Sequence, residues 1–164
     1  MIIRDEQPGD VAAIRDLTAA AFSHAPHSSG TEAAIVDALR RAGALTLSLV
    51  AVDAGVIGHV AFSPVSIAGV DGDWQGLGPV SVAAAHQRQG IGEALIRAGL
   101  ERLRADGAAG CVVLGDPAYY GRFGFISDPR LSFADVPPDY FQRLVFRGRS
   151  PAGEVRYHPA FATA

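Results

Sequence analysis

The sequence of 164 residues contains no lysine and one cysteine. All 14 basic residues are therefore arginines. Cys111 has no partner for an intramolecular disulfide, and nothing therefore argues for secretion. Its place in the apolar run CVVLG predicts a buried core thiol rather than a catalytic nucleophile.

A targeting segment and a membrane-spanning run are also missing. The first residues, MIIRDEQPGD, lack the basic and then apolar layout of a signal peptide, and no apolar run reaches the length of a membrane span. We therefore expect a cytoplasmic protein without a membrane partner. The formal net charge of −3 gives no general attraction for polyanions, so a nucleic-acid partner is not expected either.

What remains is the composition of an ordinary globular protein, with 49% hydrophobic and 19% charged residues. This balance excludes a disordered chain, and the length is sufficient for a core that needs neither a metal nor a disulfide. No linker or repeat interrupts the chain, so residues 1–164 are expected to form one domain. Apolar periodicity and turn residues predict helices over 9–23, 31–41, 90–105 and 116–122, and strands over 2–4, 45–53, 56–69, 74–83, 109–115, 141–147 and 153–157.

The most informative stretch is LGPVSVAAAHQRQGIG, residues 77–92, in which an apolar strand passes through a polar loop into a helix. The closely spaced Gly90 and Gly92 expose backbone N–H groups at the positive end of the helix dipole, which suits an anion such as a pyrophosphate. Spacing alone fits simple helix-start packing equally well. A phosphate loop with GK[ST] is excluded because there is no lysine, and a dinucleotide fold requires its glycines after the first strand.

A second motif, GDPAYYGRFGF at residues 115–125, follows the strand predicted over 109–115, which we expect to lie beside the strand over 74–83. Tyr119 and Tyr120 lie in its short helix, which would place a phenol near the bound ligand. Both can also be core aromatics, and Tyr120 is the stronger functional candidate. Asp116 is expected to cap the helix that begins at Pro117.

Together, V-S-V, Q-R-Q-G-I-G and Y-Y-x-R-F-G-F resemble the GNAT superfamily of acyl-CoA-dependent N-acyltransferases. The resemblance covers most of the chain, and the pieces LGPVSV, VVLGDPAYYGRFGF and EVRYHPAF are similar to its YhbS-like branch. It implies an α/β (α+β) fold with a mixed, mostly antiparallel central sheet that is flanked by helices and splayed at the acyl-CoA site.

The resemblance also assigns site residues. The strand residues Val80, Ser81 and Val82 match the backbone that pairs with the pantetheine arm, and the Val82 N–H would be the oxyanion donor. Tyr120 matches a tyrosine that contacts the cofactor and protonates the departing thiolate. Many members carry an Asn ahead of this tyrosine pair, and this chain has Gly115-Asp116-Pro117 instead. The residues implied to hold the CoA pyrophosphate are Gln87, Arg88, Gln89, Gly90, Ile91, Gly92 and Glu93.

The implied activity is acetyl transfer from acetyl-CoA, without a metal, to a primary amine of a small metabolite or peptide, in a monomer or homodimer. Because an alkyl amine with a pKa of ~10.4 is mostly protonated at pH 7, a base or water chain must remove a proton before direct attack. Glu32 is the candidate base. His24, His27, His59 and Asp73 are alternatives, and for each of the five residues their local pattern favours a structural role over that of a base.

Two other functions stay open at this point. The domain could bind acyl-CoA as a regulatory sensor without turnover, or it could acylate amines of proteins or charged tRNA. The retained Tyr120 argues against the sensor, since a pure binder needs no phenol near the sulfur. A tRNA substrate predicts a basic groove, against which the acidic net charge counts.

Overall fold

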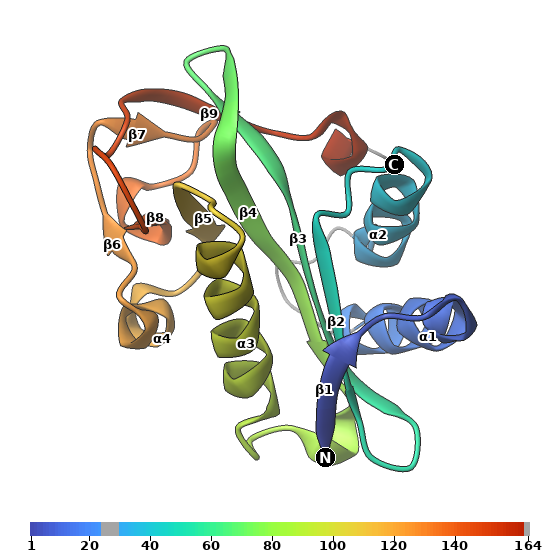
Figure 1. The fold of residues 1–164 in the computed structure, drawn as a ribbon. Coiled ribbons are helices and arrows are strands. Elements are labelled where there is room, and N and C mark those ends of the chain that lie inside the picture. Colours follow the sequence, from blue (N-terminus) through green and yellow to red (C-terminus); the bar gives the residue numbers. More distant parts are fainter. Residues whose placement is uncertain (24–29, 163–164) are drawn as a thin grey trace.

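The computed structural model describes residues 1–23 and 30–162. His24 and His27, two of the predicted base candidates, lie outside these residues. Strands of the described part form a continuous sheet, which runs through the molecule (Figure 1). They are β1 (Ile2–Asp5), β2 (Leu47–Val52), β3 (Val56–Ile67), β4 (Val70–Val82), β5 (Gly110–Leu114), β6 (Ile126–Ser127), β7 (Leu131–Ser132), β8 (Phe141–Val145) and β9 (Gly153–Tyr157).

Helices lie on both faces of this sheet, with α3 on one face and α1 and α2 on the other (Figure 1). Short 3-10 turns connect several of the longer elements. The α-helices are α1 (Val11–Phe22), α2 (Glu32–Arg41), α3 (Ile91–Ala105) and α4 (Pro117–Tyr120), and the 3-10 turns are η1 (Pro8–Asp10), η2 (Ala84–His86), η3 (Gly121–Phe123), η4 (Pro138–Tyr140) and η5 (Pro159–Ala162).

The strand order is β1-β2-β3-β4-β5-β8-β6, and β9 pairs with β3 and β7. Among the described strands, the β4–β5 and β7–β9 pairs are parallel and the other pairs are antiparallel. The predicted mixed, mostly antiparallel sheet flanked by helices is therefore confirmed.

The sheet splits between β4 and β5. These strands pair only where Trp74–Gly76 lies beside Gly110–Val112. Beyond Gly76, β4 continues to Val82 with β3 on one edge and no paired strand of the described chain on the other. We call the opening between Leu77–Val82 of β4 and the end of β5 the fork. It confirms the predicted splay.

Some local predictions were wrong. Strands were predicted over 56–69 and 74–83 with a break at residues 70–73, but β3 ends at Ile67 and β4 already begins at Val70. The turn consists of Ala68 and Gly69, both at positive φ, between the paired residues Ile67 and Val70. A two-residue hairpin favours this left-handed backbone, and the acidic and glycine residues of 71–73 gave a misleading turn signal. Strand β7 was not predicted.

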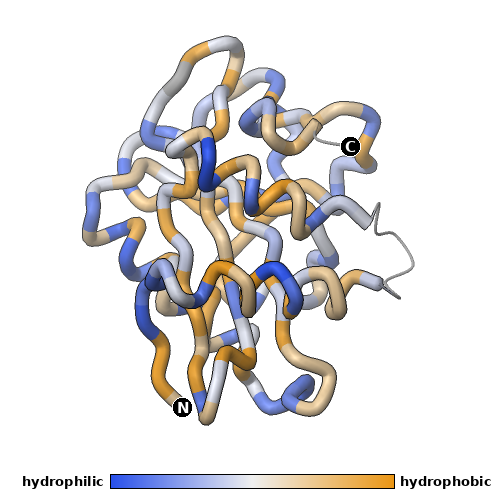
Figure 2. Tube along the Cα trace, turned by 90° about the vertical axis from the view of Figure 1, so that its right-hand side faces the viewer, coloured by the Kyte–Doolittle hydropathy of each residue, from blue (hydrophilic) through white to orange (hydrophobic). Residues whose placement is uncertain are grey.

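The main hydrophobic core lies between α3 and the sheet. Leu95 and Ile96 of α3 pack against a cluster that includes Phe62 and Cys111. Cys111 is fully buried, as predicted, and burial raises the pKa of its thiol far above the ordinary value. Hydrophobic segments concentrate in the central strands, and hydrophilic segments lie mainly in the loops and on the outer surface (Figure 2).

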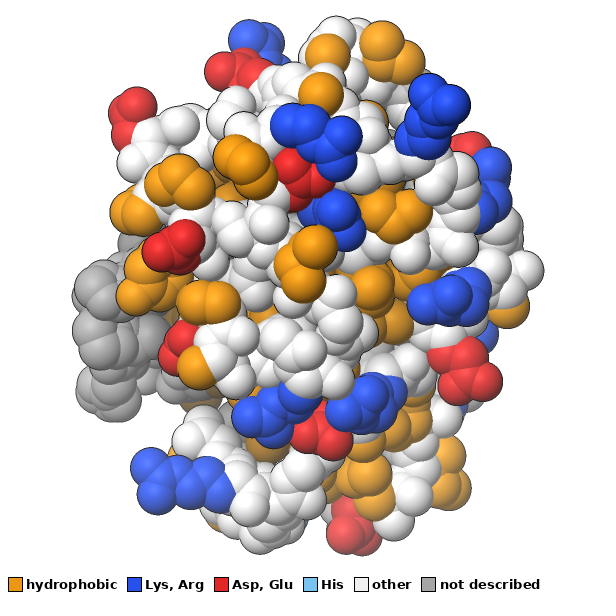
Figure 3. Space-filling model, turned by 90° about the vertical axis from the view of Figure 1, so that its left-hand side faces the viewer, with side chains coloured by type: hydrophobic (Ala, Val, Ile, Leu, Met, Phe, Trp, Pro, Cys, Tyr) orange, Lys and Arg blue, Asp and Glu red, His pale blue; other side chains and the backbone are white. Residues whose placement is uncertain are grey.

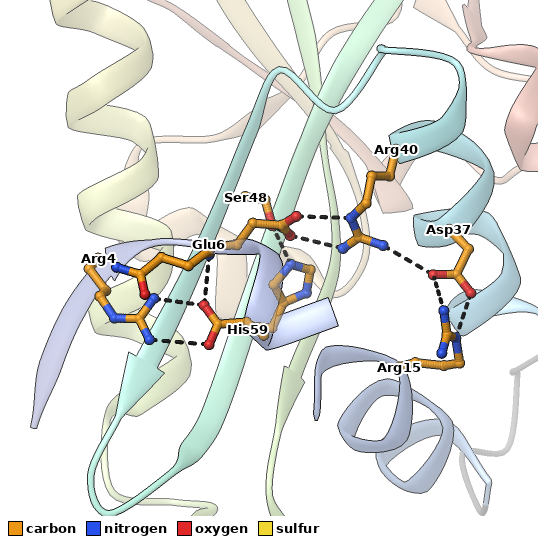
Figure 4. Close-up of polar contacts among 9 residues, drawn as sticks. Arg4, Glu6, Arg15, Asp37, Arg40, Ser48 and His59 are labelled. Carbon is orange, nitrogen blue, oxygen red and sulfur yellow. Dashed lines mark hydrogen bonds and ion pairs between the residues drawn. The ribbon is translucent and has the colours of Figure 1, made fainter. Parts of the chain in front are cut away.

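A chain of polar side chains crosses the opposite face of the sheet beneath α1 and α2 (Figure 4). The Ser48 hydroxyl lies 2.8 Å from Nε2 of His59 and 2.5 Å from Oε1 of Glu6. Arg40 of α2 donates to both carboxylate oxygens of Glu6 at 2.9 Å. We call Glu6, Ser48, His59 and Arg40 the polar brace, because it joins the residue after β1 to β2, β3 and α2.

The proton positions in the polar brace follow from its charges. Burial works to raise the pKa of Glu6, but hydrogen bonds from Arg40 and Ser48 outweigh it and hold this pKa below its ordinary value. Ionised Glu6 can only accept, so Ser48 donates its proton to Glu6 and accepts one from Nε2 of His59. Burial lowers the pKa of His59 to about 4, and the ring is neutral at pH 7.

This depressed pKa predicts a loss of stability in mild acid. Below pH 6.5 the unfolded chain binds a proton at His59, whereas the folded chain binds this proton only when the pH approaches about 4. The free energy of unfolding should therefore fall as the pH is lowered through this window, by up to about 3 kcal/mol. Denaturant titrations at several pH values measure it. The variant His59→Gln should show a weaker pH dependence, and an unchanged dependence would contradict the assignment.

Candidate functional site

A cavity of about 410 Å³ opens where β4 passes into α3. Its walls come from the end of β4, the loop before α3, the first turn of α3, and the α4–η3 segment. The lining residues are Val82, His86, Gln87, Arg88, Gly90, Ile91, Gly92, Glu93, Tyr119 and Arg122. We call the segment from Gln87 to Glu93 the cradle.

The backbone of the cradle turns sharply at two positions. Gly90, the residue before α3, has φ +81°, a left-handed conformation that favours glycine, and Arg88 has φ +62°. This path brings the chain into α3 so that the N–H groups of the first helical turn have no partner within the helix. The positive end of the helix dipole adds to them, and the cradle is suited to a phosphate group.

The charged side chains around the start of α3 favour the binding of an anion. Glu93, in the first turn of α3, pairs with Arg122 at 3.0 Å and with Arg97 at 3.3 Å. Hydrogen bonds from Arg122 and then Arg97 lower the pKa of Glu93. Because two arginines neutralise this carboxylate and Arg88 adds a further positive charge, Glu93 does not oppose anion binding.

Tyr119, not Tyr120, lines the cavity. The Arg122 guanidinium lies 4.3 Å from the centroid of the Tyr119 ring, and its Nε donates to the Tyr119 carbonyl at 2.9 Å. The Tyr119 hydroxyl approaches Gly92, where an added Cβ would lie 3.8 Å from it. Adjacent positions of a helix point about 100° apart, and the sequence favoured the neighbour. An i, i+3 pairing of Tyr119 with Arg122 was the signal that could have identified this wall.

Tyr120 points instead into the core behind the cavity. Its ring contacts Phe125 and Tyr119, with centroids 6.0 and 5.0 Å apart. It also covers Gly115, where an added Cβ would lie 2.4 Å from the ring. Burial, with smaller contributions from Tyr119 and Cys111, raises the pKa of Tyr120 to about 12. Tyr120 therefore carries a proton at neutral pH.

The fork exposes part of the β4 backbone. Ala83 N–H donates to the Ile57 carbonyl at 2.8 Å, in register with the Gly58–Val82 and Val60–Val80 pairs. Because hydrogen-bonded positions alternate along an antiparallel strand, the N–H and C=O groups of Val80 and Val82 point away from β3, toward the fork. The side chain of Gln87 donates to the Val82 carbonyl at 3.2 Å and so ties the cradle to this edge.

The other predicted residues lie apart from the cavity. Ser81, between two fork-facing residues, has a buried side chain, and Gln89 is exposed and does not line the cavity. Glu32 begins α2, on the opposite face of the sheet. Asp73 forms an exposed ion pair with Arg147 at 2.7 Å.

The structure also places the predicted helix cap, Asp116, and the histidines His59 and His86. Asp116 accepts a hydrogen bond from the Ala118 N–H at 2.9 Å, which confirms its predicted role as the α4 cap. His59 is fully buried in the polar brace and does not line the cavity. A further histidine, His86 in the turn η2 before the cradle, lies in the cavity wall.

The described residues also limit what else the molecule carries. In residues 1–23 and 30–162 no group of three or more His, Cys, Asp or Glu side chains could hold a metal. The same part of the chain contains no helix that is long and apolar enough to cross a membrane. On the face that carries β6–β8 and α4, acidic and basic side chains lie beside one another without a broad patch of one sign (Figure 3).

The fold and the site define a class of protein with a split sheet flanked by helices. In this class a helix N-terminus and an open strand edge can together hold a long, anionic ligand. Residues 3–126 match the family model of the acetyltransferase (GNAT) domain. The chain therefore belongs to the GNAT family of acetyltransferases.

Relatives of known name and structure agree with this membership. The chain is 45% identical over 127 residues to the uncharacterized N-acetyltransferase YhbS of Escherichia coli K12, which covers 76% of this chain and 73% of YhbS. A GNAT-family acetyltransferase from Brucella melitensis, solved in complex with acetyl-CoA, has a TM-score of 0.88 and 53% identity, covering 98% of this chain and 97% of that one. Escherichia coli YhbS in complex with CoA has a TM-score of 0.90 and 38% identity, covering 98% and 91%.

Proposed function

We propose that this acetyltransferase moves the acetyl group of acetyl-CoA to a primary amine of a small metabolite or peptide, by direct attack of the amine on the thioester. The observation that carries the proposal is the continuity of the site. The cradle and the open edge of β4 follow one another, in the order in which acetyl-CoA presents its pyrophosphate and its pantetheine arm.

The cofactor would bind with its pyrophosphate on the N–H groups of Gly90 to Glu93, between Arg88 and the Tyr119 wall. Its pantetheine arm would lie along the fork and pair with the backbone of Val80 and Val82, as an added strand does at a sheet edge. The open edge supports the predicted backbone roles of Val80 and Val82. The backbone of Ser81 is directed at His59 of β3 and its side chain is buried, so Ser81 is not proposed as a contact of the arm.

The oxyanion of the tetrahedral intermediate needs a backbone N–H at the fork. Val82 lies beside the cradle, with Cγ2 only 3.7 Å from where a Cβ on Gly92 would be. The pantetheine arm separates the thioester from the pyrophosphate, and Val80 lies about 7 Å further along the strand. We therefore propose the Val80 N–H as a donor to the oxyanion, together with or in place of that of Val82.

Tyr120 is proposed as the acid that protonates the departing thiolate. Its raised pKa keeps the phenol protonated at pH 7, which an acid requires. For the base that receives the amine proton we retain Glu32, at the start of α2 on the face opposite the cradle. Cys111 is buried and protonated, so an acyl-enzyme on this thiol is not part of the mechanism.

A first test replaces the proposed acid. Tyr120→Phe removes one hydroxyl and should lower kcat by about 10- to 100-fold while the Kd for acetyl-CoA stays within about twofold, because the phenol acts on the leaving group rather than on the cofactor's anchor. Steady-state kinetics and calorimetric titration measure the two quantities. Tyr140→Phe is the matched control, since Tyr140 is half exposed on η4. Equal losses of kcat and affinity would remove Tyr120 from the acid role.

A second test fills the cradle. Gly92 has no left-handed φ, and an added Cβ would make only ordinary contacts of 3.7 and 3.8 Å. Gly92→Ala should therefore keep most of the affinity for acetyl-CoA, whereas Gly92→Phe should lower it at least tenfold by occupying the cavity. Both variants should unfold at similar temperatures. Normal acetyl-CoA binding by Gly92→Phe would contradict the location of the site.

The transfer itself is tested by release of free thiol. The purified protein is mixed with acetyl-CoA and a panel of primary amines, and thiol release is followed with and without each amine. Amine-dependent release, with an acetylated product of the expected mass, supports the proposal. Tight CoA binding without release for any amine would instead indicate a binding module that senses acyl-CoA.

A further inference from the structure

A second phenol, Tyr157 at the end of β9, reaches the base of the fork. Its ring lies over Gly76, the last residue of β4 that pairs with β5, and a Cβ on Gly76 would lie 2.7 Å from Cε2 of the ring. Phe133 and Phe161 hold the ring from two sides, each with its centroid 5.0 Å away. Glycine at position 76 is thus what allows the Tyr157 ring to occupy this place.

The Tyr157 hydroxyl is buried and forms no hydrogen bond with any residue that the structure describes. An unpartnered buried hydroxyl costs stability, typically about 1–3 kcal/mol, and phenylalanine would fill the same space without that cost. The surrounding aromatic cluster supplies no acceptor for this proton. A tyrosine here is therefore explained by a hydrogen-bond partner that arrives with a ligand.

The register of the sheet marks where that ligand lies. Tyr157 is paired with Val65 of β3, and its ring reaches across that strand to Gly76, whose partner on β5 is Val112. Because β4 and β5 part directly beyond this pair, the ring lies at the base of the fork, on the face of the sheet opposite the Cys111 thiol. Burial raises the pKa of Tyr157 well above its ordinary value, so its hydroxyl is a donor throughout the neutral range.

We propose that Tyr157 is a further catalytic residue, whose hydroxyl donates a hydrogen bond to the thioester sulfur and holds the thiolate as it departs. This inference rests on the proposed function, because it assigns the sulfur to the fork. In the step concerned, the amine nitrogen forms the bond to the carbonyl carbon and the C–S bond breaks, with its electron pair passing to sulfur. Tyr120 then gives sulfur a proton, and the amine nitrogen loses one.

The experiment compares Tyr157→Phe with the wild type and with the control Tyr140→Phe, which makes the same chemical change at an exposed site. Transfer to the fastest amine of the panel should fall by about 10- to 100-fold in Tyr157→Phe. The midpoint of thermal unfolding should stay the same or rise, because the lost hydroxyl has no protein partner. A structural role predicts a lower midpoint instead.

A second readout needs no acceptor. The thiol of bound CoA is titrated by its thiolate absorbance, and its pKa should be about one unit or more higher in Tyr157→Phe than in the wild type, because a hydrogen bond to the thiolate is lost. Unchanged transfer together with an unchanged thiol pKa would overturn the role of Tyr157, as would a loss of activity that follows a lower unfolding midpoint. If the wild type acetylates no amine, the proposed function fails, and the thiol titration still decides whether Tyr157 contacts the sulfur.

Discussion

The parting of β4 from β5 after Gly76 is the constraint on which the rest of the site depends. Six residues of β4 beyond this point keep only one strand partner in the described chain, and an unpaired strand edge inside a folded protein must find other hydrogen bonds. In this molecule the cradle lies at one end of that edge, and the Tyr157 ring lies over Gly76 at the other. In the proposed binding mode the sheet provides both the backbone partner of the ligand and the distance between its anchored and reacting ends.

The two faces of the sheet are held by different kinds of interaction. On the α3 face, apolar packing of Leu95 and Ile96 against the strands fixes the helix whose N-terminus forms the cradle. On the other face, the polar brace ties the residue after β1 to β2, β3 and α2 through ionised Glu6 and neutral His59. This brace keeps a partly buried carboxylate paired with Arg40, and it explains why His59, a base candidate by sequence, is a structural residue in a fully buried position.

Much of the fold was accessible from sequence because its signals are local. Helical spacing predicted α1, α2 and α3, and the glycines at 90 and 92 predicted the turn into α3. What escaped prediction depends on tertiary contacts. Two-residue β7 has no periodicity of its own, and the Ala68–Gly69 turn lacks the acidic residues that marked 71–73. Tyr119 and Tyr120 are adjacent in sequence, and only packing against Gly115 and Gly92 decides which ring lines the cavity.

The proposed site requires acetyl-CoA to lie along the cradle and the fork, with its sulfur between Tyr120 and Tyr157. A crystal structure of the protein with bound CoA tests this arrangement. We predict the pyrophosphate on the N–H groups of residues 90–93, the pantetheine arm paired with Val80 and Val82, and the sulfur within hydrogen-bond distance of both phenols. A pantetheine arm outside the fork, or a sulfur out of reach of both hydroxyls, would contradict it.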